Sequence, residues 1–341
     1  MNTPFIVAEI GASHNGNLER AIKTVMAAAD AGAAAIKLQC YDGHTMVANQ
    51  GHVIVGGPWA GKNLYQLYKD AAMPWHWHKD LFAVAHAYKM QAFSTPFDET
   101  AVAYLEELHC PMYKVASHEI TDLHLIATIA ATGKPIILST GMATPNEISR
   151  AITAAKGSRN ITLLKCTSAY PAPMDEVNLA TIAHMRALYG TEVGLSDHSA
   201  GSIAAATATA LGASMIEKHI TLTRADGPDD GFASTPDEFA EMVRAVRATA
   251  MAMGEPTYGP TPGEAPSLAL RRGLYAMRDL QPGDIITHAK VKARRPASAI
   301  SANWLPELIG RQIVQPVAAG APLAWENTEY RPNKEQIRDP Q

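Results

Sequence analysis

Short apolar runs alternate with alanine-rich segments of helical period over about the first 255 residues of the chain. The apolar runs predict strands at residues 5–8, 34–38, 91–94, 112–115, 135–138, 161–165, 192–195 and 214–217. Segments of helical period between or after them include residues 17–31, 98–108, 145–156 and 236–253. Because each of the eight predicted strands is followed by a helix, the pattern predicts an α/β fold of the closed (β/α)8 TIM-barrel type.

An open, doubly wound sheet would show the same alternation of strands and helices. Such a sheet usually carries a G-x-G-x-x-G phosphate loop after its first strand. The first apolar run of this chain is followed by Glu9-Ile10-Gly11-Ala12-Ser13, which lacks that motif. The glycine spacing therefore favours the barrel.

One long segment, residues 42–73, interrupts the alternation between the second and third predicted strands. It contains Gly56-Gly57-Pro58-Trp59 and Leu64-Tyr65-Gln66-Leu67-Tyr68. Loops of this length in compact domains are usually functional or disordered, and these aromatic residues favour an ordered flap. The alternative is an insertion that only packs on the barrel rim.

The composition changes after the last barrel helix, where proline and glycine become frequent. The pattern predicts a catalytic barrel at residues 1–255, a linker at 256–270, a small β-rich module at 271–330 and a polar tail at 331–341. With some sixty residues and no cysteine, the module is a candidate to dock on another surface for stability.

Charge and cysteine content narrow the function classes. A net charge of -4 supplies no basic field for nucleic acid or an anionic membrane, and no apolar run is long enough to span a bilayer. The three cysteines, Cys40, Cys110 and Cys166, cannot all pair and show no CxxC spacing. These features predict a cytoplasmic protein without a disulfide framework.

Polar residues at the carboxyl ends of the predicted strands are the candidate site, because barrel active sites form there. They are Glu9; Lys37 and Gln39; Ser94 and Thr95; Lys114, Ser117 and Glu119; Ser139 and Thr140; Lys165, Thr167 and Ser168; Ser196, Asp197 and His198; and Glu217, Lys218 and His219. A single such residue is ordinary solvated surface. Their presence after every predicted strand indicates a functional site.

Two histidines within that set suggest a divalent metal ion. His198 and His219 end adjacent predicted strands, so their rings can converge on one cation, with Asp197, Glu217, Glu9 or water completing an open coordination sphere. Either histidine alone is more often a structural residue. The pair at matching positions favours a metal that polarises a substrate carbonyl.

A set of cations and hydroxyls shares the predicted site with the histidines. It comprises Lys37, Thr95, Lys114, Ser117, Ser139, Ser168 and Ser196. Lysine charges and hydroxyl donors suit a small phosphorylated carboxylate. The competing interpretation is that some of these lysines only neutralise Glu9, Glu119 or Glu217.

Two other interpretations remain open at this stage. A desolvated Lys114, Lys165 or Lys218 can form a Schiff base with a carbonyl substrate, which would make the chain a metal-free aldolase. A non-catalytic sugar-binding or structural protein is the alternative of a different class. It gives no reason for both histidines and the whole set of cations to be present.

The motifs at these strand ends resemble those of the sialic acid synthase family. They are Ala8-Glu9-Ile10-Gly11 with His14-Asn15-Gly16, Ile36-Lys37-Leu38-Gln39, Ser94-Thr95-Pro96-Phe97, Tyr113-Lys114-Val115-Ala116-Ser117, Leu138-Ser139-Thr140-Gly141-Met142, Lys165-Cys166-Thr167-Ser168, Leu195-Ser196-Asp197-His198 and Glu217-Lys218-His219. The region with Leu274-Tyr275-Ala276, Gly283-Asp284 and Arg295-Pro296 is similar to the C-terminal antifreeze-like (SAF) domain of that family.

The resemblance implies an enzyme that condenses phosphoenolpyruvate (PEP) with an amino-sugar aldehyde to a nine-carbon sugar acid and phosphate. It implies that His198 and His219 bind Mn2+, or else Mg2+ or Co2+, and that Lys37, Thr95, Lys114, Ser117, Ser139, Ser168 and Ser196 hold PEP. Glu9 and Glu119 would handle sugar hydroxyls or protons. The sugar would contact Gln39, Phe97, Tyr170, Asp229 and Arg295, the last from the SAF domain of the other chain in a domain-swapped homodimer.

Two sets of motifs resemble different subfamilies of this family. The flap and the following Pro74-Trp75-His76-Trp77-His78 are similar to pseudaminic acid synthases, which take a 2,4-diacetamido-2,4,6-trideoxy-altrose. Gly227-Pro228-Asp229 and Val177-Asn178-Leu179 are more similar to N-acetylneuraminate and legionaminate synthases. We favour pseudaminate. Ala297-Ser298-Ala299 stands where the family usually has a glycine-containing turn after the arginine.

Overall fold

The computed structural model describes residues 3–57, 59–224 and 227–329. Pro58 of the flap and the predicted tail lie outside the described residues. The chain divides into two compact units, Met1–Glu255 and Pro256–Gln341.

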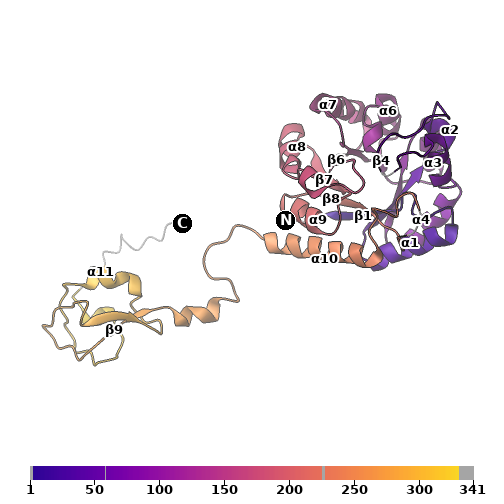
Figure 1. The fold of residues 1–341 in the computed structure, drawn as a ribbon. Coiled ribbons are helices and arrows are strands. Elements are labelled where there is room, and N and C mark those ends of the chain that lie inside the picture. Colours follow the sequence, from indigo (N-terminus) through magenta and orange to yellow (C-terminus); the bar gives the residue numbers. More distant parts are fainter. Residues whose placement is uncertain (1–2, 58, 225–226, 330–341) are drawn as a thin grey trace. The chain divides into compact units, whose positions relative to one another are not determined.

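The first unit contains, within its described residues, a closed barrel of eight parallel strands surrounded by helices (Figure 1). The strands are β1 (Phe5–Glu9), β2 (Ala35–Cys40), β3 (Gln91–Pro96), β4 (Tyr113–Val115), β5 (Ile136–Ser139), β6 (Ile161–Cys166), β7 (Glu192–Asp197) and β8 (Met215–His219). The first and last strands pair to close the barrel, with Glu9 opposite His219. The predicted TIM barrel is confirmed.

The helices begin where sequence signals place them. The helices are α1 (Leu18–Asp30), α2 (Gly43–Met46), α3 (Leu64–Ala71), α4 (Trp77–Ala87), α5 (Glu99–Glu107), α6 (Leu123–Ala131), α7 (Pro145–Ala154), α8 (Thr181–Tyr189), α9 (Ile203–Ala210) and α10 (Pro236–Met253). Thr144 and Thr235 form capping boxes ahead of α7 and α10, each followed by proline in the first turn. Their inner faces bury alanine, valine and isoleucine against the strands.

Most of the strands extend past the apolar runs that predict them. Gln39, Thr95, Ser139, Asp197 and His219 lie within strands rather than just after them. Backbone ladder bonds do not depend on side-chain polarity, so a strand continues through polar residues where its neighbour pairs with it. The site residues are thereby fixed on the barrel itself.

The flap, residues 42–73, is an ordered hairpin followed by helix α3. Val53 pairs with Asn63, and the backbone N–H of Ile54 donates to the carbonyl of Lys62 at 3.0 Å. The Asn63 side chain then caps α3 by accepting from the N–H of Gln66 at 2.8 Å. The described residues of this segment therefore form an ordered flap.

The second unit has its own small core. Strands β9 (Gly273–Ala276) and β10 (Val291–Arg294) pair antiparallel, and short helical turns η4 (Ala265–Leu270), η5 (Ala302–Trp304), α11 (Leu305–Leu308) and η6 (Trp325–Asn327) accompany them. Apolar residues such as Leu274, Ile286 and Ile313 are fully buried. The carbonyl of Ala269 in η4 accepts from the N–H of Ala297, which connects part of the predicted linker to this unit.

Candidate functional site

A cavity of about 660 Å³ lies at the carboxyl ends of the barrel strands, under the flap. Most of the predicted site residues line it: Lys37, Gln39, Phe97, Lys114, Ser117, Glu119, Ser139, Tyr170, Ser196, His198, His219 and Asp229. These side chains come from residues far apart in the chain. The barrel therefore brings them into one site.

Glu9 and Thr95 lie directly behind the cavity wall. The Glu9 carboxylate is fully buried, pairs with Lys37, and accepts from the side-chain amide of Gln39 at 3.0 Å. The Thr95 hydroxyl accepts from Lys37 Nζ at 3.2 Å. Glu9 thus orients two residues that line the cavity. Arg295 belongs to the second unit.

Two lysines and two glutamates form a buried network at the cavity floor. Glu217 Oε1 lies 3.3 Å from Lys114 Nζ and 3.8 Å from Lys37 Nζ. Burial acts to raise the pKa of Glu217, but the two ammonium groups outweigh it and hold that pKa well below its usual range. The alternative that some lysines neutralise glutamates therefore holds for Lys37 with Glu9 and Lys114 with Glu217.

A cradle of hydroxyl groups lies beside that network. Ser117 Oγ accepts from the N–H of Gly141 at 3.1 Å, while Ser139 Oγ is buried without a hydrogen-bond partner among the described residues. A Cβ atom at Gly141 would lie 2.2 Å from Ser168 Oγ and 2.7 Å from Ser117 Oγ. The hydroxyls of Ser117 and Ser168 thus pack directly against the Gly141 backbone, where only glycine leaves room for both of them. The sequence did not single out Gly141 as a site residue, although a glycine directly after the hydroxyl pair Ser139-Thr140 was a usable signal.

The variant Gly141→Ala tests this cradle. The added methyl group displaces the serine hydroxyls, so we expect the KM for an anionic substrate to rise at least about tenfold, an effect worth some 1.4 kcal/mol. The measurement is steady-state kinetics with PEP. Gly263→Ala is the matched control, because a Cβ at Gly263 meets nothing within 4 Å. An unchanged KM in Gly141→Ala would show that no anion binds over this glycine.

The two predicted metal-binding histidines lie side by side. Their ring centroids are 5.5 Å apart, and both line the cavity. His198 Nδ1 is 2.9 Å from the carbonyl of Thr167, so as a donor it leaves Nε2 unprotonated for a ligand bond. His219 Nδ1 is buried without a hydrogen-bond partner in the described part of the chain, and it lies 3.5 Å from Asp229 Oδ2.

The residues fit a metal site with open positions rather than a closed one. Among the described residues, no group of three or more histidine, cysteine, aspartate or glutamate side chains is arranged to hold a metal ion. Two histidines can bind one cation if water or substrate supplies further ligands. Asp229, held by the N–H of Ala12 at 2.8 Å, lies beside them.

Three residues from the sequence-based hypotheses serve the structure instead. Asp197 Oδ2 pairs with Lys218 Nζ at 2.7 Å, and both side chains are buried. Lys165 donates to the carbonyl of Cys166 at 2.9 Å. Of the three lysines considered for a Schiff base, only Lys114 lines the cavity, and Asp197 is not placed as a metal ligand.

An aromatic wall covers the histidines. The Tyr170 ring lies 4.2 Å from that of His198, and the Phe232 ring lies 5.1 Å from that of His219. Trp59 of the flap packs on both aromatic residues and donates from Nε1 to the carbonyl of Pro228 at 3.0 Å. Phe232 was missed from the sequence, where its only signal was its position after the glycine-containing loop that follows β8.

Glu119 is a titratable group of the cavity whose charge can change near neutral pH. Its Oε2 is buried and lacks a hydrogen-bond partner within the described residues. Burial raises the pKa of Glu119 to about 7, although its own backbone N–H and Lys114 favour the charged form. A carboxyl group with such a pKa suits proton exchange with a substrate.

The raised pKa predicts how stability changes with pH. The fold favours the protonated acid, so its stabilising contribution is full below the ordinary value of 4.5 and is lost as pH rises through about 7. We expect the free energy of unfolding of the wild type, relative to Glu119→Gln, to fall between about pH 5 and about pH 9. Urea denaturation at both pH values measures this. Glu107→Gln, an exposed change, should show no such trend; a flat difference for Glu119→Gln would contradict the raised pKa.

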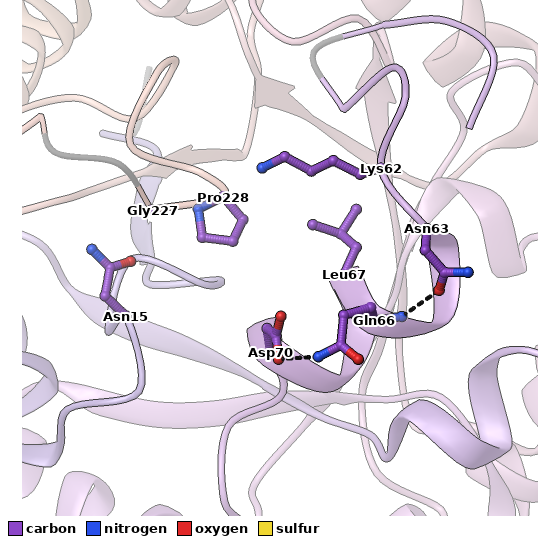
Figure 2. A pocket seen from close by; sticks show the side chains of 8 residues that line it. All are labelled: Asn15, Lys62, Asn63, Gln66, Leu67, Asp70, Gly227 and Pro228. Atoms are coloured by element: carbon purple, nitrogen blue, oxygen red, sulfur yellow. Dashed lines mark hydrogen bonds between the residues drawn. The ribbon is translucent and has the colours of Figure 1, made fainter. Parts of the chain in front are cut away.

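A second, more open cleft lies on the other side of the flap helix (Figure 2). Its walls include Asn15, Lys62, Gln66 and Asp70, with the Gln66 amide donating to Asp70 at 2.6 Å. Leu67 and Pro228 border both this cleft and the main cavity. Helix α3 therefore stands between two hollows, and none of its residues is buried.

The closed barrel with a polar cavity at its carboxyl ends defines a (β/α)8 protein with an anion-suited site. Comparison with known proteins identifies the family within this class. Residues 24–258 match the NeuB family, and residues 271–328 match the SAF domain. The chain belongs to the NeuB family.

Similar proteins align over nearly the whole chain. The pseudaminic acid synthase of Helicobacter pylori is 39% identical over 337 residues, which cover 96% of this chain and 99% of that protein. An N,N'-diacetyllegionaminic acid synthase of Campylobacter jejuni is 34% identical, covering 91% of this chain and 96% of its own. The crystal structure of N-acetylneuraminic acid synthetase from Leptospira borgpetersenii, in complex with citrate, has a TM-score of 0.71 at 31% identity, covering 78% of this chain and 90% of that one.

No described helix has both the length and the apolar composition needed to cross a membrane.

Proposed function

We propose that this chain is a PEP-dependent nonulosonic acid synthase. It condenses PEP with a 2,4-diacetamido-2,4,6-trideoxy hexose to give pseudaminic acid and phosphate. The observation that carries the proposal is the convergence of Lys114, Ser117 and the histidine pair on one cavity, with Ser168 beside Ser117 at Gly141. Identity of 37% and 39% to pseudaminic acid synthases supports this choice of acceptor sugar.

The barrel residues would bind and orient PEP. Lys37 and Lys114 would provide ammonium groups for its carboxylate or phosphate, while Ser117 and Ser139 of the cavity wall and the neighbouring Ser168 would donate hydroxyl hydrogen bonds. The C3 carbon of PEP attacks the sugar aldehyde, water adds at C2, and phosphate leaves with its bridging oxygen. Glu119 would exchange the proton that these steps require.

His198 and His219 would hold a divalent cation, which we propose to be Mn2+. The ion supplies Lewis-acid polarisation of the sugar aldehyde. Charge supports its presence, because Lys37 and Lys114 are already balanced by Glu9 and Glu217. Without a further positive charge, the cavity would have no surplus to offset the charge of PEP.

We also propose a homodimer in which the second unit of one copy covers the cavity of the other and presents Arg295 to the substrate. Large apolar side chains at the carboxyl ends of the barrel support this idea. Val55, Met142 and Ile203 are 94%, 65% and 68% exposed. Sedimentation measures the mass of the assembly. If each active site takes Arg295 from the other copy, mixing inactive His219→Ala with inactive Arg295→Ala should restore activity. No recovery of activity would contradict a site formed by two copies.

The function is tested by phosphate release from PEP with Mn2+ and either the trideoxy altrose derivative or N-acetylmannosamine. We expect release with the former, and a nine-carbon acid by mass spectrometry. Faster release with N-acetylmannosamine would point to a neuraminate synthase. Inactivation by borohydride with substrate, but not by a chelator, would support the Schiff-base aldolase instead. Absence of release with any sugar would refute the proposal.

A further inference from the structure

The cavity wall is divided between two kinds of surface. The barrel strands and the segments that directly follow them provide its charged groups, including Lys37, Lys114 and Glu217. The flap provides a mainly apolar surface made of Met46, Ile54, Val55, Trp59, Leu64 and Leu67. No charged side chain from the described flap residues lines this cavity; its polar contributions there are His52 and Tyr68. A ligand that fits both surfaces carries charge at one end and apolar groups at the other.

Hydrogen bonds order the flap hairpin internally, and one bond connects it to the loop after β8. The N–H of Gly61 donates to the carbonyl of Ile54 at 2.8 Å, and the N–H of Leu64 donates to that of His52 at 2.9 Å. Trp59 connects the other side of the hairpin to Pro228, next to Asp229. The apolar surface is therefore a fixed part of the site.

Leu67 is central to this surface. It extends from α3 between the main cavity and the second cleft, as Figure 2 shows on the cleft side. The side chain is partly buried although its helix has no fully buried residue. Leu67 thus has room to contact a ligand.

We propose that the flap, through Leu67 together with Ile54 and Leu64, selects the acceptor sugar by contacting its methyl groups. The inference rests on the proposed function. The trideoxy diacetamido sugar carries a C6 methyl and two acetyl methyls, whereas N-acetylmannosamine has one acetyl methyl and hydroxyls at C4 and C6. Methyl groups gain from leaving water, and hydroxyls facing an apolar wall lose hydrogen bonds. One methyl group changes specificity by roughly 10- to 200-fold.

The variant Leu67→Asn tests this proposal, because asparagine has nearly the same shape as leucine but is polar. The measurements are kcat/KM for both sugars and KM for PEP. We expect the wild-type preference for the trideoxy sugar to fall roughly tenfold, while KM for PEP stays within about twofold. Lys69→Asn places the same residue on an exposed position of the same helix outside the cavity, and should leave both sugars unaffected.

Equal loss of activity with both sugars, or the same loss in Lys69→Asn, would overturn the inference. If the wild type releases phosphate with neither sugar, the proposed function fails separately. Calorimetric titration of the two sugars into wild type and Leu67→Asn then tests whether the flap selects the acceptor sugar. Tighter binding of the trideoxy sugar that is lost in the variant supports selection; equal affinities refute it.

Discussion

Phosphate release by the His219→Ala variant is expected to fall by about three orders of magnitude. The proposed metal has two histidine ligands. Removing one of them should remove several kcal/mol of Lewis-acid stabilisation of the transition state. The fold should survive, because His219 Nδ1 makes no hydrogen bond within the described residues. Circular dichroism measures the fold, and calorimetry with Mn2+ measures binding.

His124→Ala is the control for the loss of an imidazole. Its side chain is 78% exposed, and its ion-pair partner is Glu99. The control should keep both turnover and Mn2+ affinity. Wild-type activity in His219→Ala, or undiminished Mn2+ binding by it, would rule out the metal assignment.

Replacing Lys114 by methionine is expected to damage both catalysis and stability. The Lys114 side chain is 2% exposed and its Nζ lies 3.3 Å from Glu217 Oε1, so its loss leaves a buried carboxylate without its nearer ion-pair partner. Breaking such a pair costs about 3–5 kcal/mol of unfolding free energy. Loss of a preorganised charge facing the proposed substrate PEP should lower kcat/KM by roughly 100- to 1000-fold.

The double variant Lys114→Met/Glu217→Gln separates the two effects. Removing the unpaired charge should restore much of the stability, measured by urea denaturation, but none of the activity. A double variant as unstable as Lys114→Met would mean that Glu217 does not depend on Lys114. A double variant with wild-type kcat/KM would show that Lys114 does not contribute to PEP binding.

The fold could be predicted closely because the pattern of apolar runs follows backbone geometry. Strand β1 begins at Phe5 and strand β7 at Glu192, as the sequence indicates. Carboxyl ends of strands were less predictable. Polar residues such as Gln39 and His219 end the apolar run but continue the backbone ladder, since pairing to a neighbouring strand does not require an apolar side chain.

The site could be predicted in membership but only partly in role. Residue type and position placed Lys114, Ser117 and His198 at one end of the barrel. Glu9 looked equivalent to them, yet its side chain is directed into the wall. Gly141 has no side chain to suggest chemistry, and its value comes from the close approach of the Ser117 and Ser168 hydroxyls to its backbone. Such roles depend on side-chain direction and on the paths of neighbouring loops, which one sequence does not specify.

Pairing of β1 with β8 places the first and last strands of the barrel at the centre of the site. Glu9 lies opposite His219, and Gly11 approaches Asp229 so closely that any Cβ there would be 2.1 Å from its carboxylate. During synthesis, domains generally fold as units while the chain emerges from the ribosome. The nascent chain therefore has no complete site until the residues up to Asp229 have left the ribosomal tunnel. Ligand binding by the growing chain would report closure of the barrel.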